Sequence, residues 1–437
     1  FYFHNVRSCL FHLISYTHPF ITFYFYKWWG MLKRNVGHFG ILFASVGGII
    51  GSGWLFGALF AAQMAGPAAL ISWVIGGVSI LLLALTFAEV ATLFPLSGGV
   101  ASYPIFTHGR IVGFVLTWIT WLTYVVSIAQ EVQSTVFYMA NKFPSFVEKS
   151  ASGVNVLTSE GMILSFLITG VLVTLNSFGV QFLAKTNNLI TIWKILVPLA
   201  VVIFFLFTSH DISHLKLESF STFAPYGAHG ILSAVALSGV VYSFCGFQHG
   251  ALLAGEAKNP QKSVPFALIG SISVCFLLYL ALQYSFITAL PASALANGWH
   301  ALSFAGDAGP LAGLAGFLGL TWLVFVLYVD SIISPLGTGV LYVSSSARIV
   351  QNMSASGSAP RFFAKLTRAG SPLRAIIFNF FISLVAFLPF EGWQAIVSFL
   401  SSALVFSFAV GPICLMSLRK THPELKRPFS LPFHRLI

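Results

Sequence analysis

The chain has 437 residues, of which 57% are hydrophobic and only 8% are charged, and its mean hydropathy is +0.88. These values lie far outside the range of soluble proteins and predict a polytopic membrane protein that lies in a lipid bilayer. The formal net charge of +11 could indicate a nucleic-acid partner. The positions of the basic residues indicate membrane orientation instead, so we expect no nucleic-acid partner.

The first thirty residues, 1–30, are crowded with aromatic side chains and lack both a starting Met and a signal-peptide cleavage pattern. The segment that begins at Met31, with MLKR, looks like the native start. We expect residues 1–30 to be a non-native leader or, as the alternative, an interfacial helix rich in Phe and Trp.

Apolar runs long enough to cross a bilayer, which takes roughly 20 residues, recur along the rest of the chain and predict an all-α architecture of ten spans. Five of them fall in residues 31–207 and five in residues 208–418, and a basic tail follows at 419–437. The expected spans are 39–63, 67–94, 111–140, 161–180, 187–207, 229–252, 263–289, 314–347, 374–390 and 393–418.

The loops between these spans differ strongly in charge. When they are assigned alternately to the two sides, sixteen Lys and Arg residues fall on one side, and only Lys142, Lys149 and Lys216 fall on the other. Positive residues concentrate on the cytoplasmic side of membrane proteins. The amino terminus and the tail are therefore expected in the cytoplasm, and short loops in a compact chain fit a bacterial inner membrane.

Two of the ten expected spans are interrupted by glycine-containing stretches. The first span contains residues 47–53, GGIIGSG, and the sixth contains residues 243–247, SFCGF. In hydrocarbon, an unpaired backbone group is tolerated only where it lines a cavity or meets a ligand. Breaks at matching positions of two halves indicate the binding site of a secondary transporter.

Several short motifs occur in an order that resembles the amino acid-polyamine-organocation superfamily. The resemblance covers about residues 36–433, and its motifs are 48–53 (GIIGSG), 88–90 (AEV), 94–99 (FPLSGG), 246–248 (GFQ), 255–260 (GEAKNP) and 346–348 (SAR). It implies the leucine-transporter-like fold, in which spans 1–5 and 6–10 form two inverted repeats with broken helices 1 and 6. It also implies two carboxyl-terminal helices that would follow Ile437 and are missing here. Five spans per half and opposite entry directions agree with that architecture.

The resemblance carries over to the substrate site residue by residue. Ile50, Gly51, Ser52 and Gly53 match the stretch whose amides bind a substrate α-carboxylate, and Gly51 lets the chain unwind. In the sixth span, the matching residues have carbonyls that take the α-amino group and an aromatic ring that covers the ligand; they are Tyr242, Ser243, Phe244 and Gly246. The alternative role for such glycines is close helix packing.

Lys194 places an ammonium inside the apolar span 187–207, within residues 191–198, TIWKILVP. A Lys at that depth is a functional candidate, because it can take up and release a proton. It matches the lysine that replaces a bound cation in proton-coupled members of the superfamily, so the resemblance implies proton coupling. The expected neighbours are carbonyls near Gly48 and Ile49 and the helix-8 pair Gly337 and Thr338. The alternative is a side chain that snorkels to the cytoplasmic edge.

Other polar residues inside the expected spans have less defined roles. Glu131 and Asp330 can each relay protons, contact a substrate side chain, or pair with a polar neighbour that holds the bundle together. Tyr342 matches an aromatic substrate contact of helix 8. Glu89 lies at the cytoplasmic end of its span, where a packing or gating role is expected. Gln248 stands where several exchangers of the superfamily have an acid, and it cannot titrate.

The sequence contains no phosphate-binding loop, zinc spacing or nucleophile elbow, so ATP-driven transport, catalysis, metal sites and cofactors are not expected. The four cysteines have no paired spacing and are interpreted as packing residues. His249 and His300 are isolated and are interpreted as surface or packing residues.

The function that these patterns favour is a secondary active amino acid transporter that is coupled to protons and works by alternating access. The alternative is an amino acid exchanger without net proton movement. A channel would show continuous polar rings that line a pore, and a nutrient receptor would show a large extra soluble domain. Neither feature is visible in the sequence. The general resemblance to bacterial aspartate-proton symporters favours an acidic or neutral amino acid, and the patterns leave the oligomeric state open.

Overall fold

The computed structural model describes residues 34, 36–151, 153–178, 180–208, 211–215, 220–304, 309–367, 370–388 and 392–431. The expected leader 1–30 lies outside the described residues, and so do residues 432–437 of the expected tail. The described chain is mostly helical, with one small hairpin of β1 (Val147–Lys149) and β2 (Asn155–Leu157), which pair antiparallel.

The helices follow one another with short connections. They are α3 (His38–Ile49), α4 (Gly53–Ala65), α5 (Ala69–Leu93), α6 (Gly99–Met139), α7 (Ser159–Ser177), α8 (Val180–Thr208), α9 (Phe220–Phe223), α10 (Gly227–Leu237), α11 (Val240–Ser243), α12 (His249–Leu252), α13 (Pro260–Ala289), α14 (Pro310–Phe317), α15 (Thr321–Ala355), α16 (Leu373–Val385) and α17 (Gly392–Thr421). The 3-10 turns are η1 (Gly66–Ala68), η2 (Pro144–Phe146), η3 (Ile212–Leu215), η4 (Ala254–Glu256), η5 (Ala292–Leu295), η6 (Trp299–Ala301) and η7 (Arg361–Ala364).

Seven helical segments among the described residues are long and apolar enough to cross a membrane, so the chain is a multi-pass membrane protein. Three further apolar helices are shorter: α3, α10 and α16. They coincide with parts of the expected spans 39–63, 229–252 and 374–390. The total of ten spans therefore stays a prediction.

Some expected boundaries were wrong. The run 314–347 is not one helix, because α14 ends at Phe317 and α15 begins at Thr321. Gly319 between them has φ +74°, a conformation that glycine adopts without strain. In the other direction, α6 begins at Gly99 rather than near residue 111. It continues through a bend at Gly109, which has φ 78°.

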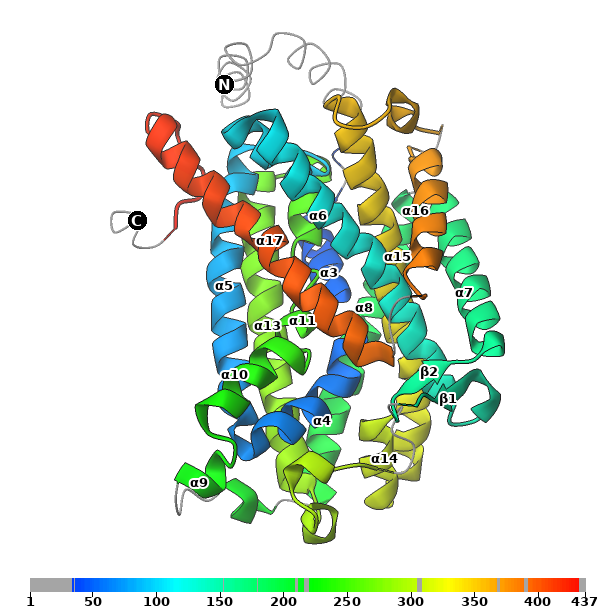
Figure 1. Ribbon diagram of the computed structural model, residues 1–437. Helices are drawn as coiled ribbons and strands as arrows, with labels where there is room; N and C mark the ends of the chain where they lie inside the picture. Colours follow the sequence, from blue (N-terminus) through cyan, green and yellow to red (C-terminus); the bar gives the residue numbers. More distant parts are fainter. Residues whose placement is uncertain are drawn as a thin grey trace.

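Figure 1 shows how the helices are arranged. The carboxyl-terminal helix α17 crosses one face of the bundle diagonally, in front of α3 and α13, while α7 and α16 lie together at one edge. The most extensive packing joins α15 to α6, α17 to α6, and α13 to α5 and α3. Apolar side chains remain exposed on the edge helices, among them Leu167 and Val171 of α7 and Phe381 and Val385 of α16. Lipid chains can cover such apolar side chains without a cost in free energy.

Two interruptions bring backbone into the middle of this bundle. The helix α3 ends at Ile49 and α4 begins at Gly53. The second interruption separates α10, α11 and α12, and it includes Gly246 with φ +102°. All four residues from Ile50 to Gly53 are buried, so the freed amides and carbonyls must find partners inside the protein.

Candidate functional site

The amino end of α4 holds a carboxylate. The backbone N–H of Ser52 donates to Oε2 of Glu131 on α6 at 2.8 Å, and both residues are buried. The first amides of a helix have no partner inside it and carry partial positive charge. The site therefore has the chemistry of an anion-binding helix terminus, and a side chain of the same protein fills it.

Three other polar groups surround Ser52. Gln130 donates through Nε2 to the Ser52 hydroxyl at 2.6 Å, and Trp393 of α17 donates through its indole at 3.2 Å. The hydroxyl of Tyr242 on α11 lies within hydrogen-bond distance of Oε1 of Gln130 and of Oε1 of Glu131, the latter at 3.0 Å. Since a phenol carries one proton, it donates to one of these acceptors at a time. Residues from α6, α11 and α17 thus meet at the break between α3 and α4.

Glycines allow the two interrupted segments to touch. A Cβ at Gly53 would lie 2.7 Å from Oγ and 3.0 Å from Cα of Ser243. A Cβ at Gly246 would overlap the carbonyl group of Gly48. The residues expected to hold the substrate, from both segments, are therefore neighbours. Their close approach also fulfils the packing role that the sequence left open.

Phe244 is fully buried next to this contact. Its ring packs against Trp73 of α5, with centroids 5.8 Å apart, and against Tyr279 of α13, with centroids 5.5 Å apart. The Tyr279 hydroxyl donates to the carbonyl of Ile49 at 3.2 Å. These contacts fix the ring of Phe244 beside the end of α3.

Lys194 of α8 has no exposed surface, so its side chain does not snorkel to the membrane edge. Its ammonium donates to the carbonyl of Gly47 at 2.7 Å and to Oγ1 of Thr338 at 2.6 Å. Thr338 in turn lies 2.9 Å from the Gly47 carbonyl and 3.1 Å from the Ile50 carbonyl. The cation therefore joins the end of α3 to α15, with Gly47 in place of the carbonyls expected near Gly48 and Ile49.

Two of the expected residues, Asp330 and Tyr342, make no hydrogen bond to Ser52 in the part of the chain that the structure describes. Asp330 is buried near the beginning of α15 and accepts from the Trp193 indole at 2.8 Å and from the Ser334 hydroxyl at 2.7 Å, both through Oδ1. Tyr342, further along α15, packs edge-on against Tyr124 and His249, with centroids 5.4 and 5.1 Å apart.

The structure adds residues that the sequence patterns did not single out. Trp393 contacts Ser52 from a helix more than three hundred residues later, and no motif marks it.

The two histidines that stand isolated in the sequence lie in different surroundings. His249 is not on the surface: it is buried, and its Nδ1 lies 2.7 Å from Oγ of Ser345. His300, by contrast, lies at an exposed turn, where its ring packs on Tyr226. Cys245, Cys275 and Cys414 are buried free thiols, consistent with packing.

The sequence motifs meet at one end of the bundle. Glu256, in GEAKNP, forms an ion pair with Arg348, in SAR, at 3.1 Å. Ser97, in FPLSGG, donates to the Glu256 carboxylate at 3.3 Å, and its carbonyl accepts from Asn352 at 3.0 Å. These contacts join the turn after α5, the end of the second interrupted segment and α15.

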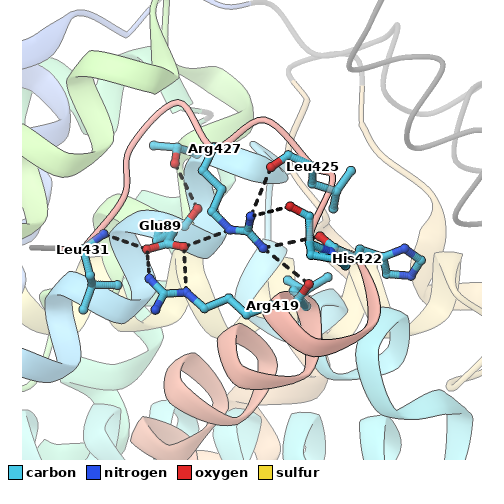
Figure 2. Close-up of polar contacts among 9 residues, drawn as sticks. Glu89, Arg419, His422, Leu425, Arg427 and Leu431 are labelled. Atoms are coloured by element: carbon cyan, nitrogen blue, oxygen red, sulfur yellow. Dashed lines mark hydrogen bonds and ion pairs between the residues drawn. The ribbon is translucent and has the colours of Figure 1, made fainter. Parts of the chain in front are cut away.

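Glu89 of α5 forms a second buried cluster at this end. Figure 2 shows its carboxylate between Arg419, which donates through Nη2 at 2.8 Å and Nε at 3.2 Å, and Arg427, whose Nε lies 3.1 Å away. The backbone N–H of Leu431 donates to the same carboxylate at 2.8 Å. Because Glu89 has no exposed surface, it fixes the segment after α17 onto the end of α5, which agrees with a packing or gating role.

A bundle of apolar helices fits a membrane transporter when a carboxylate binds the buried amino end of one helix and a lysine joins two others. Residues 36–436 match the family model described as amino acid permease. The chain therefore belongs to the amino acid permease family.

Its relatives are membrane transporters and not enzymes. The glutamate/serine transporter AimA of Bacillus subtilis (strain 168) is 40% identical over 408 residues, which cover 92% of this chain and 74% of the relative. The aspartate-proton symporter of the same organism is 34% identical over 405 residues, covering 92% and 76%. A methylthioribose transporter from that bacterium is 26% identical over 416 residues, covering 92% and 85%. The family expected from the motifs is thus confirmed.

Proposed function

We propose that this chain is a secondary active transporter that moves an amino acid together with a proton by alternating access. The observation that carries the proposal is the hydrogen bond from the Ser52 amide to a carboxylate. In the loaded state, the amides of Ser52 and Gly53 bind the α-carboxylate of the substrate. The carbonyls of the stretch from Tyr242 to Gly246 take its α-amino group, opposite the positive helix terminus.

The architecture that supports this function is a leucine-transporter-like pair of inverted repeats, made of α3 to α8 and of α10 to α17. Both halves start with an interrupted helix, and the two interruptions are in contact. The amino terminus lies in the cytoplasm and the membrane is the inner membrane of a bacterium. The Glu89 and Glu256 clusters then lie at the cytoplasmic end and close it.

Glu131 acts as an internal substitute for the substrate carboxylate. It occupies the Ser52 amide through Oε2 and reaches the Tyr242 hydroxyl through Oε1. A Cβ at Gly51 would lie 2.5 Å from the same carboxylate, so little room remains for a second anion. The substrate must displace Glu131, and a protonated Glu131 is displaced more easily because a neutral group binds the helix terminus less strongly. Substrate and proton binding are linked in this way.

Lys194 is the second part of the coupling device. Its ammonium binds a carbonyl of α3 and a hydroxyl of α15. The resemblance to the superfamily implies that this is the position at which sodium-coupled members bind a cation. Loss of its proton removes the ammonium that joins α3 to α15, and α3 is then free to move. The proton and the substrate therefore bias the same conformational equilibrium.

The substrate class is acidic or neutral amino acids. The names of the two Bacillus subtilis transporters mention glutamate, serine and aspartate. The described residues near Ser52 include one carboxylate, Glu131, which is used by the helix terminus. A cationic substrate side chain would need further carboxylates there.

The test is uptake of a radiolabelled amino acid panel into liposomes that contain the purified protein, with and without an inward proton gradient and with a sodium gradient as control. Accumulation that depends on the proton gradient supports symport and identifies the substrate. Uptake that ignores the gradient and requires internal amino acid would make the protein an exchanger instead.

A further inference from the structure

A stripe of polar groups runs along α15 from Lys194 toward the beginning of that helix. Thr338, Ser334 and Asp330 are spaced four residues apart, so they lie on one face of α15. The stripe extends about 12 Å, at 1.5 Å per residue. All three side chains are buried. It ends toward the part of the bundle where α14 lies, opposite the end at which the red carboxyl-terminal part of α17 lies (Figure 1).

Asp330 is the acidic group of this stripe, and its two oxygens differ. Oδ1 accepts from the Trp193 indole at 2.8 Å and from the Ser334 hydroxyl at 2.7 Å. Oδ2 has no hydrogen-bond partner among the described residues, although the Trp54 indole lies nearby. A fully buried carboxylate needs compensation for each oxygen. A proton on Oδ2 would provide it, so the geometry suits a carboxyl group that holds a proton.

A second stripe of polar side chains lies on α6, the neighbour of α15. Glu131, Ser134 and Tyr138 share one face of α6, the helix that packs most extensively against α15. Ser134 Oγ and the Tyr138 hydroxyl are buried and have no hydrogen-bond partner among the described residues. Tyr138 interacts electrostatically with Asp330. The α6 side of this region therefore also carries buried hydroxyls without a hydrogen-bond partner among the described residues.

The charged and titratable groups around Asp330 are few. Lys194 of α8 interacts electrostatically with both Asp330 and Glu131. Tyr138 faces Asp330 from α6, while Tyr328 lies on α15 itself and interacts with Tyr138. The sequences of α4 and α14 contain no titratable residue. One ammonium thus interacts with two carboxylates. The formal charge of these three groups is −1, and one added proton neutralises it.

We propose that Asp330 is the proton entry residue of this transporter. The inference rests on the proposed proton-coupled function and adds the side from which the proton arrives. The Asp330 carboxylate takes a proton from the aqueous side at which α15 begins and becomes a neutral acid. It returns to the carboxylate when it gives this proton to the Ser334 hydroxyl, 2.7 Å from Oδ1, and Ser334 gives up its own proton toward Lys194. The Lys194 side chain, neutral after it has given up its own proton, receives the proton and becomes the ammonium that binds Thr338 and Gly47.

The experiment compares two kinds of transport in liposomes. Gradient-driven accumulation requires net proton entry, whereas exchange of labelled for unlabelled amino acid at equal pH does not. Asp330→Asn keeps the shape of the side chain but cannot carry the proton, so accumulation should fall at least tenfold while exchange stays within twofold of the parent. Asp330→Glu should restore accumulation. Trp193→Phe removes a hydrogen bond to the same carboxylate but leaves the acid, and should accumulate substrate like the parent.

Each other result overturns the proposal. If Asp330→Asn accumulates substrate normally while Lys194→Ala does not, the proton-coupled function stands and the entry role of Asp330 is wrong. If Asp330→Asn and Trp193→Phe lose exchange and accumulation together, Asp330 is structural. If the parent itself ignores the proton gradient, the proposed function fails first, and the entry role fails with it.

Discussion

Glu131→Gln tests whether a carboxylate of the protein competes with the substrate for the Ser52 amide. Hydrogen bonds to charged groups contribute about 1.5–3 kcal/mol, and those between neutral groups about 0.5–1.5 kcal/mol. The Ser52 amide and the Tyr242 hydroxyl both interact with the Glu131 carboxylate, at 2.8 and 3.0 Å. Replacing the carboxylate by an amide lowers each of these two contributions by about 1–1.5 kcal/mol, so the internal competitor weakens by about 2–3 kcal/mol. This corresponds to substrate binding that is roughly 30- to 150-fold tighter.

The assay is equilibrium binding of a labelled amino acid to purified protein at several pH values. In the parent, lowering the pH protonates Glu131 and should raise the substrate affinity toward that of the variant. The variant should show a shallower pH profile than the parent, because its amide does not titrate while Lys194 and Asp330 still do. Glu160→Gln, an exposed acid at the start of α7, is the matched control and should bind like the parent. Equal or weaker binding by Glu131→Gln would refute the competition and make Glu131 a direct substrate contact or a structural residue.

Three further substitutions test the site and its closure. Lys194→Ala should abolish proton-driven accumulation while exchange remains measurable in the same liposomes; persistent accumulation would make Lys194 structural. Gly246→Ala should lower the free energy of unfolding by about 1–3 kcal/mol, since its φ of +102° strains an alanine and its Cβ would overlap Gly48. Thermal unfolding in detergent measures this, and Gly170→Ala, which meets nothing within 4 Å, should not destabilise. Glu89→Gln should cost about 3 kcal/mol, because it leaves two mostly buried arginines without their partner; an unchanged unfolding midpoint, matching that of the exposed-site control Glu424→Gln, would contradict this.

The sequence by itself determined the class of the protein and indicated two of the places where its helices are interrupted. Apolar runs of about twenty residues predict membrane helices, and glycines inside them indicate where the backbone can leave the helix, so both features are local. The order of the motifs along the chain was also visible in the sequence. It indicated the family that the matching family model and the related transporters confirm. Lys194 was recognisable because a charge inside an apolar run is rare.

Only the tertiary structure decided which partners these residues have. Nothing in the sequence indicated that Glu131 would bind the Ser52 amide, since they lie 79 residues apart, or that Trp393 would reach the same serine. The division of an apolar run into α14 and α15 depends on the backbone angle at Gly319, which composition does not specify. Contacts between distant segments follow from how whole helices pack, and that packing depends on the shapes of all side chains together rather than on any local pattern.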